Sequence, residues 1–268
     1  MDRKILRWIE TAVIIILAVS YGWTAFHRNS LWRDELSLWS DVIGKSPEKA
    51  RPYIGLALAL KKAGSVDKAI ELAGHGVSIN PSYSEGNFIL GQCYLEKGLT
   101  DEAIYYLMTA LYLKPDYSYA YNSLGSAYIR KGLTDEAVRA FQKAAILNPG
   151  FIPFKINLAA AYGTKGMLDT AIKELINITS TYPDEPEAHY NLGIAYKLKG
   201  LKDPAIAELN ETIRLRPEDT RALYYLGDIY LHEKAVETAL LLYKRILSIK
   251  PDDKYAMMAR QRIQEIAK

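Results

Sequence analysis

Apolar residues along this chain of 268 residues follow two different patterns. Near the amino end, the stretch from Thr11 to Phe26 contains no charged residue and is apolar on every side. A helix of this kind has no face suited to water, so the stretch predicts a segment that enters a membrane or is removed from the mature chain. From residue 50 onward, leucine, alanine and tyrosine recur at helical spacing between polar residues.

The second pattern repeats every 34 residues. Proline keeps this interval at Pro47, Pro81, Pro115, Pro149, Pro183, Pro217 and Pro251. Leucine keeps it at Leu56, Leu90, Leu124, Leu158, Leu192 and Leu226, and glycine or alanine follows each of them. A large residue stands four positions later, at Leu60, Tyr94, Tyr128, Tyr162, Tyr196 and Tyr230, and alanine recurs at Ala69, Ala103, Ala137, Ala171, Ala205 and Ala239. A fixed interval of this length indicates a solenoid built from one repeated unit.

Each unit is expected to contain two helices. The leucine and the large residue four positions later share one face of the first helix, and the small residue between them lets a neighbouring helix approach. Glycine is expected to end the first helix in a left-handed conformation, at Gly64, Gly98, Gly132, Gly166 and Gly200. Thr100, Thr134 and Asp203 are residue types that favour the N-cap of the second helix. The periodic proline then stops that helix.

The pattern of Leu–Gly, Tyr, Ala and terminal Pro resembles the tetratricopeptide repeat (TPR) family. Six copies are expected, at residues 50–83, 84–117, 118–151, 152–185, 186–219 and 220–251. The family's usual tryptophan is replaced by Tyr53, Asn87, Tyr121, Lys155, His189 and Leu223, and the last copy has Lys234 where the others have glycine. The resemblance implies an all-α, right-handed superhelix of six helix-turn-helix repeats.

Capping helices are expected at both ends of the array, since terminal repeats otherwise expose apolar faces. Residues 30–49 supply an apolar stripe at helical spacing, formed by Trp32, Leu36, Trp39 and Ile43. Residues 252–268 supply a comparable stripe, formed by Tyr255, Met258, Ala259, Ile263 and Ile266.

Residues 1–29 predict a membrane anchor, with one transmembrane helix through residues 5–28. The basic residues that precede the uncharged stretch favour a cytoplasmic amino end, with the repeats in the periplasm or an equivalent lumen. A cleaved signal peptide is the alternative, because Ala18 and Ser20 have the small side chains and the spacing of a cleavage site.

Composition narrows the possible functions. The net charge is +3, and basic and acidic residues are interspersed, so the chain lacks the basic stripe of a nucleic-acid binder. The single cysteine, Cys93, cannot form a disulfide within the chain and is expected to be a buried thiol. The four histidines show no metal-ligand spacing. We therefore expect no catalytic residue, no metal, no cofactor and no small-molecule substrate.

By the family resemblance, the first helices line a concave groove that holds a protein or an extended peptide. The groove positions are Arg51, Ile54, Phe88, Gln92, Tyr119, Asn122, Ser126, Ile156, Asn157, Tyr190, Asn191, Ile194, Arg221, Tyr224 and Asp228. Their mixture of apolar and amide side chains suits a segment with apolar anchors. Packing between adjacent repeats is the alternative role for the tyrosines and isoleucines among them.

Two ligand-binding motifs known from the family can be compared with this chain, position by position. The carboxylate clamp of chaperone adaptors is not supplied in any register of the repeats. The asparagine ladder of the nucleocytoplasmic O-GlcNAc transferase, which grips a peptide backbone, is matched only at Asn157 and Asn191.

The stretch from Arg28 to Ala57 carries a second resemblance, to multipass glycosyltransferases of the protein O-mannosyltransferase type. It is similar to the junction between their last membrane helix and their TPR tail, which implies placement of the repeats on the exported side and no activity. The expected function is a membrane-anchored scaffold or adaptor for protein–protein interaction. The alternative is an accessory component of a membrane glycosylation system that presents acceptor proteins to a separate glycosyltransferase.

Overall fold

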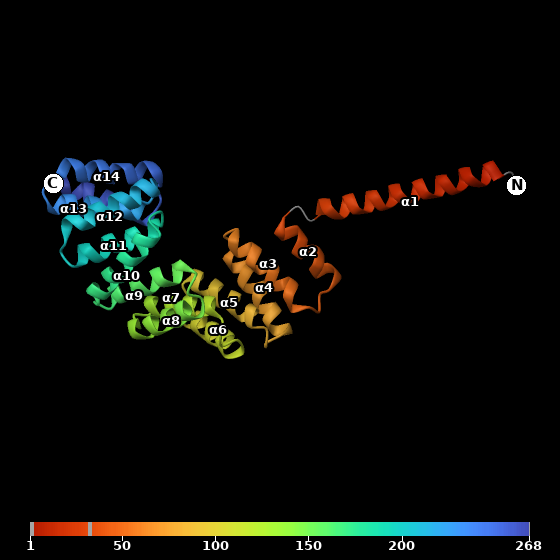
Figure 1. The fold of residues 1–268 in the computed structure, drawn as a ribbon, viewed down its shortest axis with the longest axis horizontal. Helices are drawn as coiled ribbons and strands as arrows, with labels where there is room; N and C mark the ends of the chain where they lie inside the picture. Colours follow the sequence, from red (N-terminus) through yellow and green to blue (C-terminus); the bar gives the residue numbers. More distant parts are fainter. Residues whose placement is uncertain (1–2, 32–33, 268) are drawn as a thin grey trace. The chain divides into compact units, whose positions relative to one another are not determined.

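The computed structural model describes residues 3–31 and 34–267, and this part of the chain contains fifteen helices and no strand (Figure 1). The amino-terminal helices are α1 (Arg3–Leu31) and α2 (Glu35–Lys45). The repeat region forms α3 (Ala50–Lys62), α4 (Val66–Ile79), α5 (Ser84–Lys97), α6 (Thr100–Leu113), α7 (Ser118–Arg130), α8 (Thr134–Leu147), α9 (Ile152–Thr164), α10 (Leu168–Thr181), α11 (Pro186–Leu198), α12 (Lys202–Leu215), α13 (Thr220–His232) and α14 (Val236–Ile249). The last helix is α15 (Lys254–Ile266). The all-α prediction is confirmed.

The chain divides into two compact units, Met1–Asp116 and Tyr117–Lys268. In the first unit, α3 packs on α4 and α5 packs on α6. In the second, the packed pairs are α7 with α8, α9 with α10, α11 with α12, and α13 with α14. Each pair lies within one of the expected 34-residue copies, so the period corresponds to two helices. The handedness of the complete array stays a prediction from the family resemblance.

Within each unit, the first helices of consecutive repeats contact one another. These contacts join α3 to α5, α7 to α9, α9 to α11, and α11 to α13. Over the described residues, no such contact joins the second helices of consecutive repeats. The first helices therefore form the more closely spaced layer of the stack, which is the inner layer of a curved array. This layer carries the side chains of the candidate site.

The small residue after each leucine sits where two helices meet. A Cβ atom added at Gly193 would lie 2.9 Å from Cγ of Leu209 in α12. At Gly91, it would lie 2.8 Å from Cγ of Leu107 in α6. Both leucines are fully buried. The close approach predicted from the sequence is thus found, and a larger residue here requires the paired helices to move apart.

The turn within each repeat uses glycine as expected. Gly64, Gly98, Gly132, Gly166 and Gly200 have φ angles from 76° to 85°, in the left-handed region. Lys234 occupies the same place in the last repeat with φ of 62°. Its backbone N–H donates to the carbonyl of Leu231 at 3.1 Å, which closes the turn in the way that Gly200 closes its own. An L-residue in this region is strained by about 1–2 kcal/mol.

The residues predicted as N-caps of the second helices lie inside those helices, because this turn is short. Only Gly98 and Leu99 separate α5 from α6, so Thr100 is already the first residue of the helix. Leu99 occupies the N-cap position, where it has no side-chain capping bond. In α12, Asp203 likewise lies inside the first turn. The expectation that Thr100, Thr134 and Asp203 are N-caps is therefore wrong, because two turn residues leave no position for them outside the helix.

Helices pack over both ends of the repeats. In α2, the indole of Trp39 lies where a Cβ atom of Gly55 would be, 2.3 Å from it, so Trp39 covers α3 directly. Trp32, which the predicted stripe includes, lies outside the described residues. In α15, Ala259 is buried, and Tyr255, Met258, Ile263 and Ile266 pack against the core of the last repeat. Both capping helices are found where the apolar stripes predicted them.

The uncharged stretch from Thr11 to Phe26 lies within α1, and the side chains of this stretch are exposed. Over the described residues, α1 packs on α2 alone. None of the helices in the described part of the chain combines the length and apolar character required to cross a membrane. The transmembrane helix expected through residues 5–28 is thus not found. At about 1.5 Å per residue, the uncharged stretch is shorter than a hydrocarbon core of about 30 Å.

Candidate functional site

The expected groove residues separate into two groups by burial. Ile54, Phe88, Ile156, Tyr224 and Asp228 are buried and form part of the packing behind the inner surface. The others are accessible to solvent at least in part: Arg51, Gln92, Tyr119, Asn122, Ser126, Asn157, Tyr190, Asn191, Ile194 and Arg221. Only the second group can contact a partner without local rearrangement, because a buried side chain has no free surface.

In the amino-terminal unit, accessible groove residues border a cavity of about 190 Å³ between α2, α3 and α5. Its lining includes Trp39, Arg51 and Ile54, together with Tyr83, which directly precedes α5, and Glu85 of α5. Burial and a hydrogen bond to Glu85 raise the pKa of Tyr83 to about 12. The Tyr83 hydroxyl therefore stays protonated and donates to the Glu85 carboxylate at 2.9 Å. This cavity joins the capping helix to the predicted groove.

In the carboxy-terminal unit, Arg221 contacts several side chains on the inner surface. Its guanidinium donates to both carboxylate oxygens of Glu187 in α11, at 3.0 and 2.8 Å. It also donates to both oxygens of Asp219, at 3.1 and 2.8 Å. The guanidinium carbon lies 4.3 Å from the ring centroid of Tyr190, in cation–π contact. One arginine thus connects two neighbouring first helices and fixes a tyrosine between them.

Asp219 holds this network to the start of α13. Its carboxylate accepts the backbone N–H groups of Arg221 and Ala222, as the N-cap of the helix. Burial acts to raise the pKa of Asp219, but the hydrogen bonds and charge of Arg221 outweigh it and hold the pKa below its ordinary value. Asp219 is therefore charged at neutral pH.

Tyrosines continue the inner surface from Arg221 to the end of the array. The ring of Tyr225 lies 6.2 Å from the rings of Tyr190 and Tyr255, measured between centroids. Tyr224 packs behind them, 5.8 Å from Tyr243 and Tyr255. Burial, followed by the neighbouring tyrosines, raises the pKa of Tyr190. Its hydroxyl consequently remains a neutral donor and acceptor at physiological pH.

The two asparagines of the partial ladder have different surroundings. The Asn157 side-chain amide donates to the Asn122 side-chain carbonyl of the preceding repeat at 2.8 Å. The Asn191 amide donates to the backbone carbonyl of Glu187 at 2.8 Å, within α11. These bonds orient both side chains and still leave acceptor capacity on the Asn157 and Asn191 carbonyls.

A second cavity, of about 180 Å³, lies between α9, α10 and α11. It brings together three expected groove residues, Tyr190, Asn191 and Ile194. The remaining lining is formed by Ala159, Ala160, Gly163, Thr164, Ala171, Leu175, Ala195 and Leu198. None of these was among the expected groove residues, because that expectation favoured large side chains. The informative signal in the sequence was the run of small residues in α9.

Two side chains singled out in the sequence have structural roles. His189 is buried, and its ring nitrogens contact the Glu208 carboxylate at 2.6 Å and the Pro183 carbonyl at 2.9 Å. It thus ties α11 to α12 at the position of the family's usual tryptophan. Cys93 is fully buried, and burial raises the pKa of its thiol to about 11. The expectation of a buried thiol is confirmed.

Comparison with known proteins identifies the repeated unit. Models of the tetratricopeptide repeat match residues 84–117, 118–151 and 199–254. No curated protein matches the chain.

Solved structures share the fold. The Cut9–Hcn1 hetero-tetramer of the APC/C aligns with a TM-score of 0.72 at 22% identity, over 87% of this chain and 46% of that chain. The present chain thus spans less than half the length of that relative. A tetratricopeptide repeat protein from Parabacteroides merdae aligns with a TM-score of 0.73 at 17% identity, over 90% and 95% of the two chains. YrrB, described as a TPR protein with an unusual peptide-binding site, aligns with a TM-score of 0.56 at 23% identity, over 74% and 97%. The helix pairs within residues 84–117, 118–151 and 199–254 thus match the tetratricopeptide repeat, and the solved structures share the fold of the chain.

Proposed function

We propose that this chain is a non-catalytic scaffold that binds protein partners, as extended segments, through the inner surface of its first helices. The observation that carries this proposal is the cavity beside Tyr190, Asn191 and Ile194. It combines an open apolar hollow with oriented polar groups on the inner layer of the stack. This combination suits a peptide, whose side chains need pockets and whose backbone needs hydrogen-bond partners.

The state of the ionic groups supports binding over catalysis. Arg221, Glu187 and Asp219 satisfy one another through paired hydrogen bonds. Such pairing stiffens the surface before a partner arrives, and a stiff surface loses less entropy on binding. General acid–base catalysis instead requires a group that exchanges a proton near the working pH. Asp219 and Arg221 hold their charges through their mutual contacts and do not provide one.

Site-specific photo-crosslinking tests the binding surface. A photoreactive amino acid is placed at Ile194 on the inner surface or at Lys173, which is exposed on the second helix α10. We expect a discrete crosslinked protein from Ile194 and none from Lys173 in cells that express the chain. Crosslinks from Lys173 alone would show that the second helices form the recognition surface.

A separate proposal concerns the surroundings of the chain. We propose that α1 attaches the chain to a membrane, because apolar side chains such as Ile14, Ile16 and Val19 are exposed on this helix. Exposed apolar surface of this extent favours contact with lipid. Resistance of the full-length chain to carbonate extraction is the expected result. Complete release by carbonate would contradict a hydrophobic attachment.

The proposed location of the repeats is the periplasm or an equivalent lumen. A retained anchor and a cleaved signal peptide both export the segment that follows them. Protease added to intact cells with a permeabilised outer envelope should digest the repeats. The amino-terminal sequence of the mature chain should distinguish a retained anchor from a cleaved signal peptide. Protection of the repeats from protease would contradict this location. The glycosylation role has no support beyond the resemblance from Arg28 to Ala57, and we do not propose it.

A further inference from the structure

Three positions in α9 differ from their counterparts in the other repeats. Ala160 stands where the other copies have Leu58, Gln92, Ser126, Ile194 and Asp228. Gly163 stands where they have Lys61, Leu95, Ile129, Lys197 and Leu231. Thr164 stands where they have Lys62, Glu96, Arg130, Leu198 and His232. The spacing i, i+3, i+4 places all three on one face of α9, so this face lacks the larger side chains usually found at these positions in the other repeats.

The cavity of about 180 Å³ is the space left by these small residues. Opposite them, Tyr190, Ile194 and Leu198 form a wall along α11 at intervals of four residues. Leu175 of α10 lies at its base and is fully buried. A Cβ atom added at Gly163 would meet only Ala171 Cβ, at 3.9 Å, so the hollow is open here. A cavity of about 150 Å³ accommodates a benzene ring, so this one is large enough for a leucine, methionine or phenylalanine side chain.

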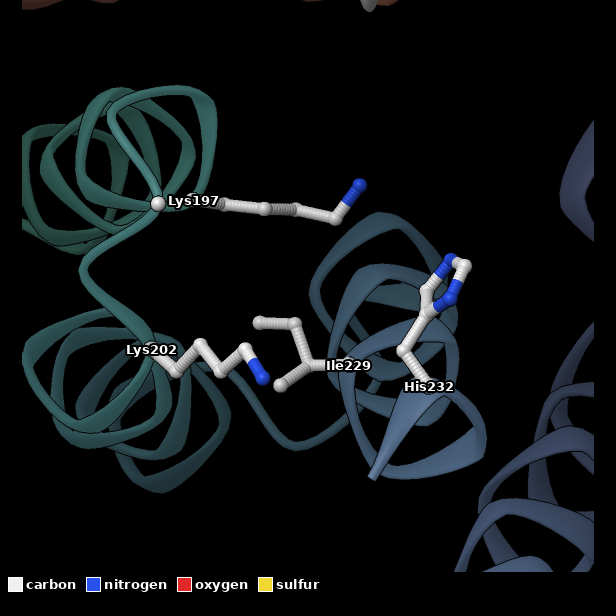
Figure 2. Close-up of a pocket in the computed structure, with 5 residues that line it drawn as sticks. Lys197, Lys202, Ile229 and His232 are labelled. Atoms are coloured by element: carbon white, nitrogen blue, oxygen red, sulfur yellow. The ribbon is translucent and has the colours of Figure 1, made fainter. Parts of the chain in front are cut away.

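A different cavity, of about 200 Å³, lies on the other side of α11. It is lined by Lys197, Gly200, Lys202, Ile229 and His232, and Figure 2 shows the three basic side chains around a common space above Ile229. Lys197 and Lys202 have carboxylate partners, Asp228 and Glu233, but neither carboxylate lines the cavity. The polar side chains that line this space are all basic; the ion pairs offset the charge of the two lysines, but each ammonium keeps N–H donors that suit an acidic group.

The spacing of the two cavities matches an extended chain. One lies between α9 and α11, and the other lies between α11 and α13. Neighbouring packed helices are separated by roughly 8–10 Å. An extended peptide advances by about 3.3 Å per residue, so it covers this distance in about three residues.

We propose that the two cavities together bind one extended peptide with a bulky apolar residue and an acidic residue about three positions apart. The apolar side chain enters the hollow beside Ala160 and Gly163, and the carboxylate lies among Lys197, Lys202 and His232. This inference rests on the proposed scaffold function and adds the chemistry of the segment that is bound. The charge of the basic cavity and the size of the apolar one together define the occupant.

Selection from a library of random twelve-residue peptides displayed on phage tests the proposal, with the purified full-length chain as bait. We expect the enriched peptides to contain leucine, methionine or phenylalanine, with aspartate or glutamate about three positions away. Ala160→Leu fills the hollow with a side chain of the size that Leu58 and Ile194 have at this register. This variant should lose the apolar preference and retain the acidic one. Lys202→Gln with His232→Gln should have the opposite effect.

The control is Lys173→Leu, which adds the same side chain on the exposed face of α10 in the same repeat, outside the inner surface, and it should leave both preferences unchanged. Circular dichroism verifies folding, and Gly163→Ala provides a milder filling if Ala160→Leu does not fold. The proposal is overturned if no shared motif is enriched, or if Ala160→Leu and Lys173→Leu behave alike. Crosslinks from Ile194 without this motif would retain the scaffold function and reject the inference.

Discussion

Arg221 and Glu187 occupy the same register in consecutive repeats, 34 residues apart, and are joined by two hydrogen bonds of 3.0 and 2.8 Å. The guanidinium and the carboxylate meet in the bidentate geometry that gives such pairs both strength and direction. Their contact crosses from α13 to α11 on the inner surface. It therefore sets the spacing of α11 and α13, between which the cavity with the basic lining lies.

A double-mutant cycle measures this coupling. Arg221→Gln and Glu187→Gln, alone and together, should give a coupling free energy of about 1 kcal/mol in urea unfolding, since the pair is partly shielded and bidentate. The comparison pair is Arg214 and Glu211, which are three residues apart on an exposed face of α12. Their coupling should amount to only a few tenths of a kcal/mol, about the value of exposed helical pairs. Equal coupling in the two pairs would argue against a special role for Arg221.

Acid should weaken the carboxy-terminal unit through Asp219. Because the pKa of this carboxyl is lower in the folded chain than its ordinary value, its charged form stabilises the fold above that value. This stabilisation is lost as the pH falls below the ordinary value of 3.8 and through the lowered pKa. Thermal unfolding should show a smaller decrease in midpoint over this range for Asp219→Asn than for the wild type. Parallel pH profiles would contradict the assignment.

Two glycines in helices should respond oppositely to the same substitution. Gly193→Ala places a methyl group 2.9 Å from Leu209 and should destabilise the fold by about 1–3 kcal/mol. Gly74→Ala adds the same methyl in α4, where no atom lies within 4 Å, and should stabilise it by up to about 1 kcal/mol. Thermal unfolding midpoints of the two variants provide the measurement. A stabilising Gly193→Ala would show that the packing at this crossing is looser than described.

The turn at Lys234 offers a stabilising change. Lys234→Gly removes a side chain from a left-handed residue, and the relief of strain should exceed the added flexibility of the unfolded chain, for a gain of up to about 1 kcal/mol. Ala63→Gly is the control, since Ala63 precedes the turn glycine of the first repeat and has φ of −81°. It should be destabilising, because glycine there brings flexibility without relief of strain. Hydrogen exchange near each turn detects both effects.

The repeat architecture was predictable from sequence because each 34-residue unit encodes its own helices and turn. The proline interval, the glycine turns and the stripe around Trp39 all reflect local geometry, and the structure contains the elements that they predict. The N-caps failed because the number of turn residues, and not the type of residue at Thr100, decides where the helix starts.

The functional surface was less predictable. Tyr224 was among the expected groove positions, with packing as its alternative role, and it is buried against Tyr243 and Tyr255. Position in the repeat specifies which helix face a residue occupies, but neighbouring side chains determine whether it reaches solvent. The cavity beside Gly163 was missed for the same reason, because a hollow depends on what surrounds a small residue.

The binding constant of a crosslinked partner for inner-surface and outer-surface variants tests the central claim most directly. Once the partner captured at Ile194 is purified, Asn191→Ala with Ile194→Ala should weaken its binding at least tenfold, since loss of a central contact costs on the order of 1–2 kcal/mol. Lys173→Glu with Glu174→Lys reverses two exposed charges on α10 and should change the binding constant less than twofold, as expected of peripheral charges worth about 0–1 kcal/mol. If the charge reversal abolishes binding and the double alanine variant binds like the wild type, the inner surface is not the recognition surface.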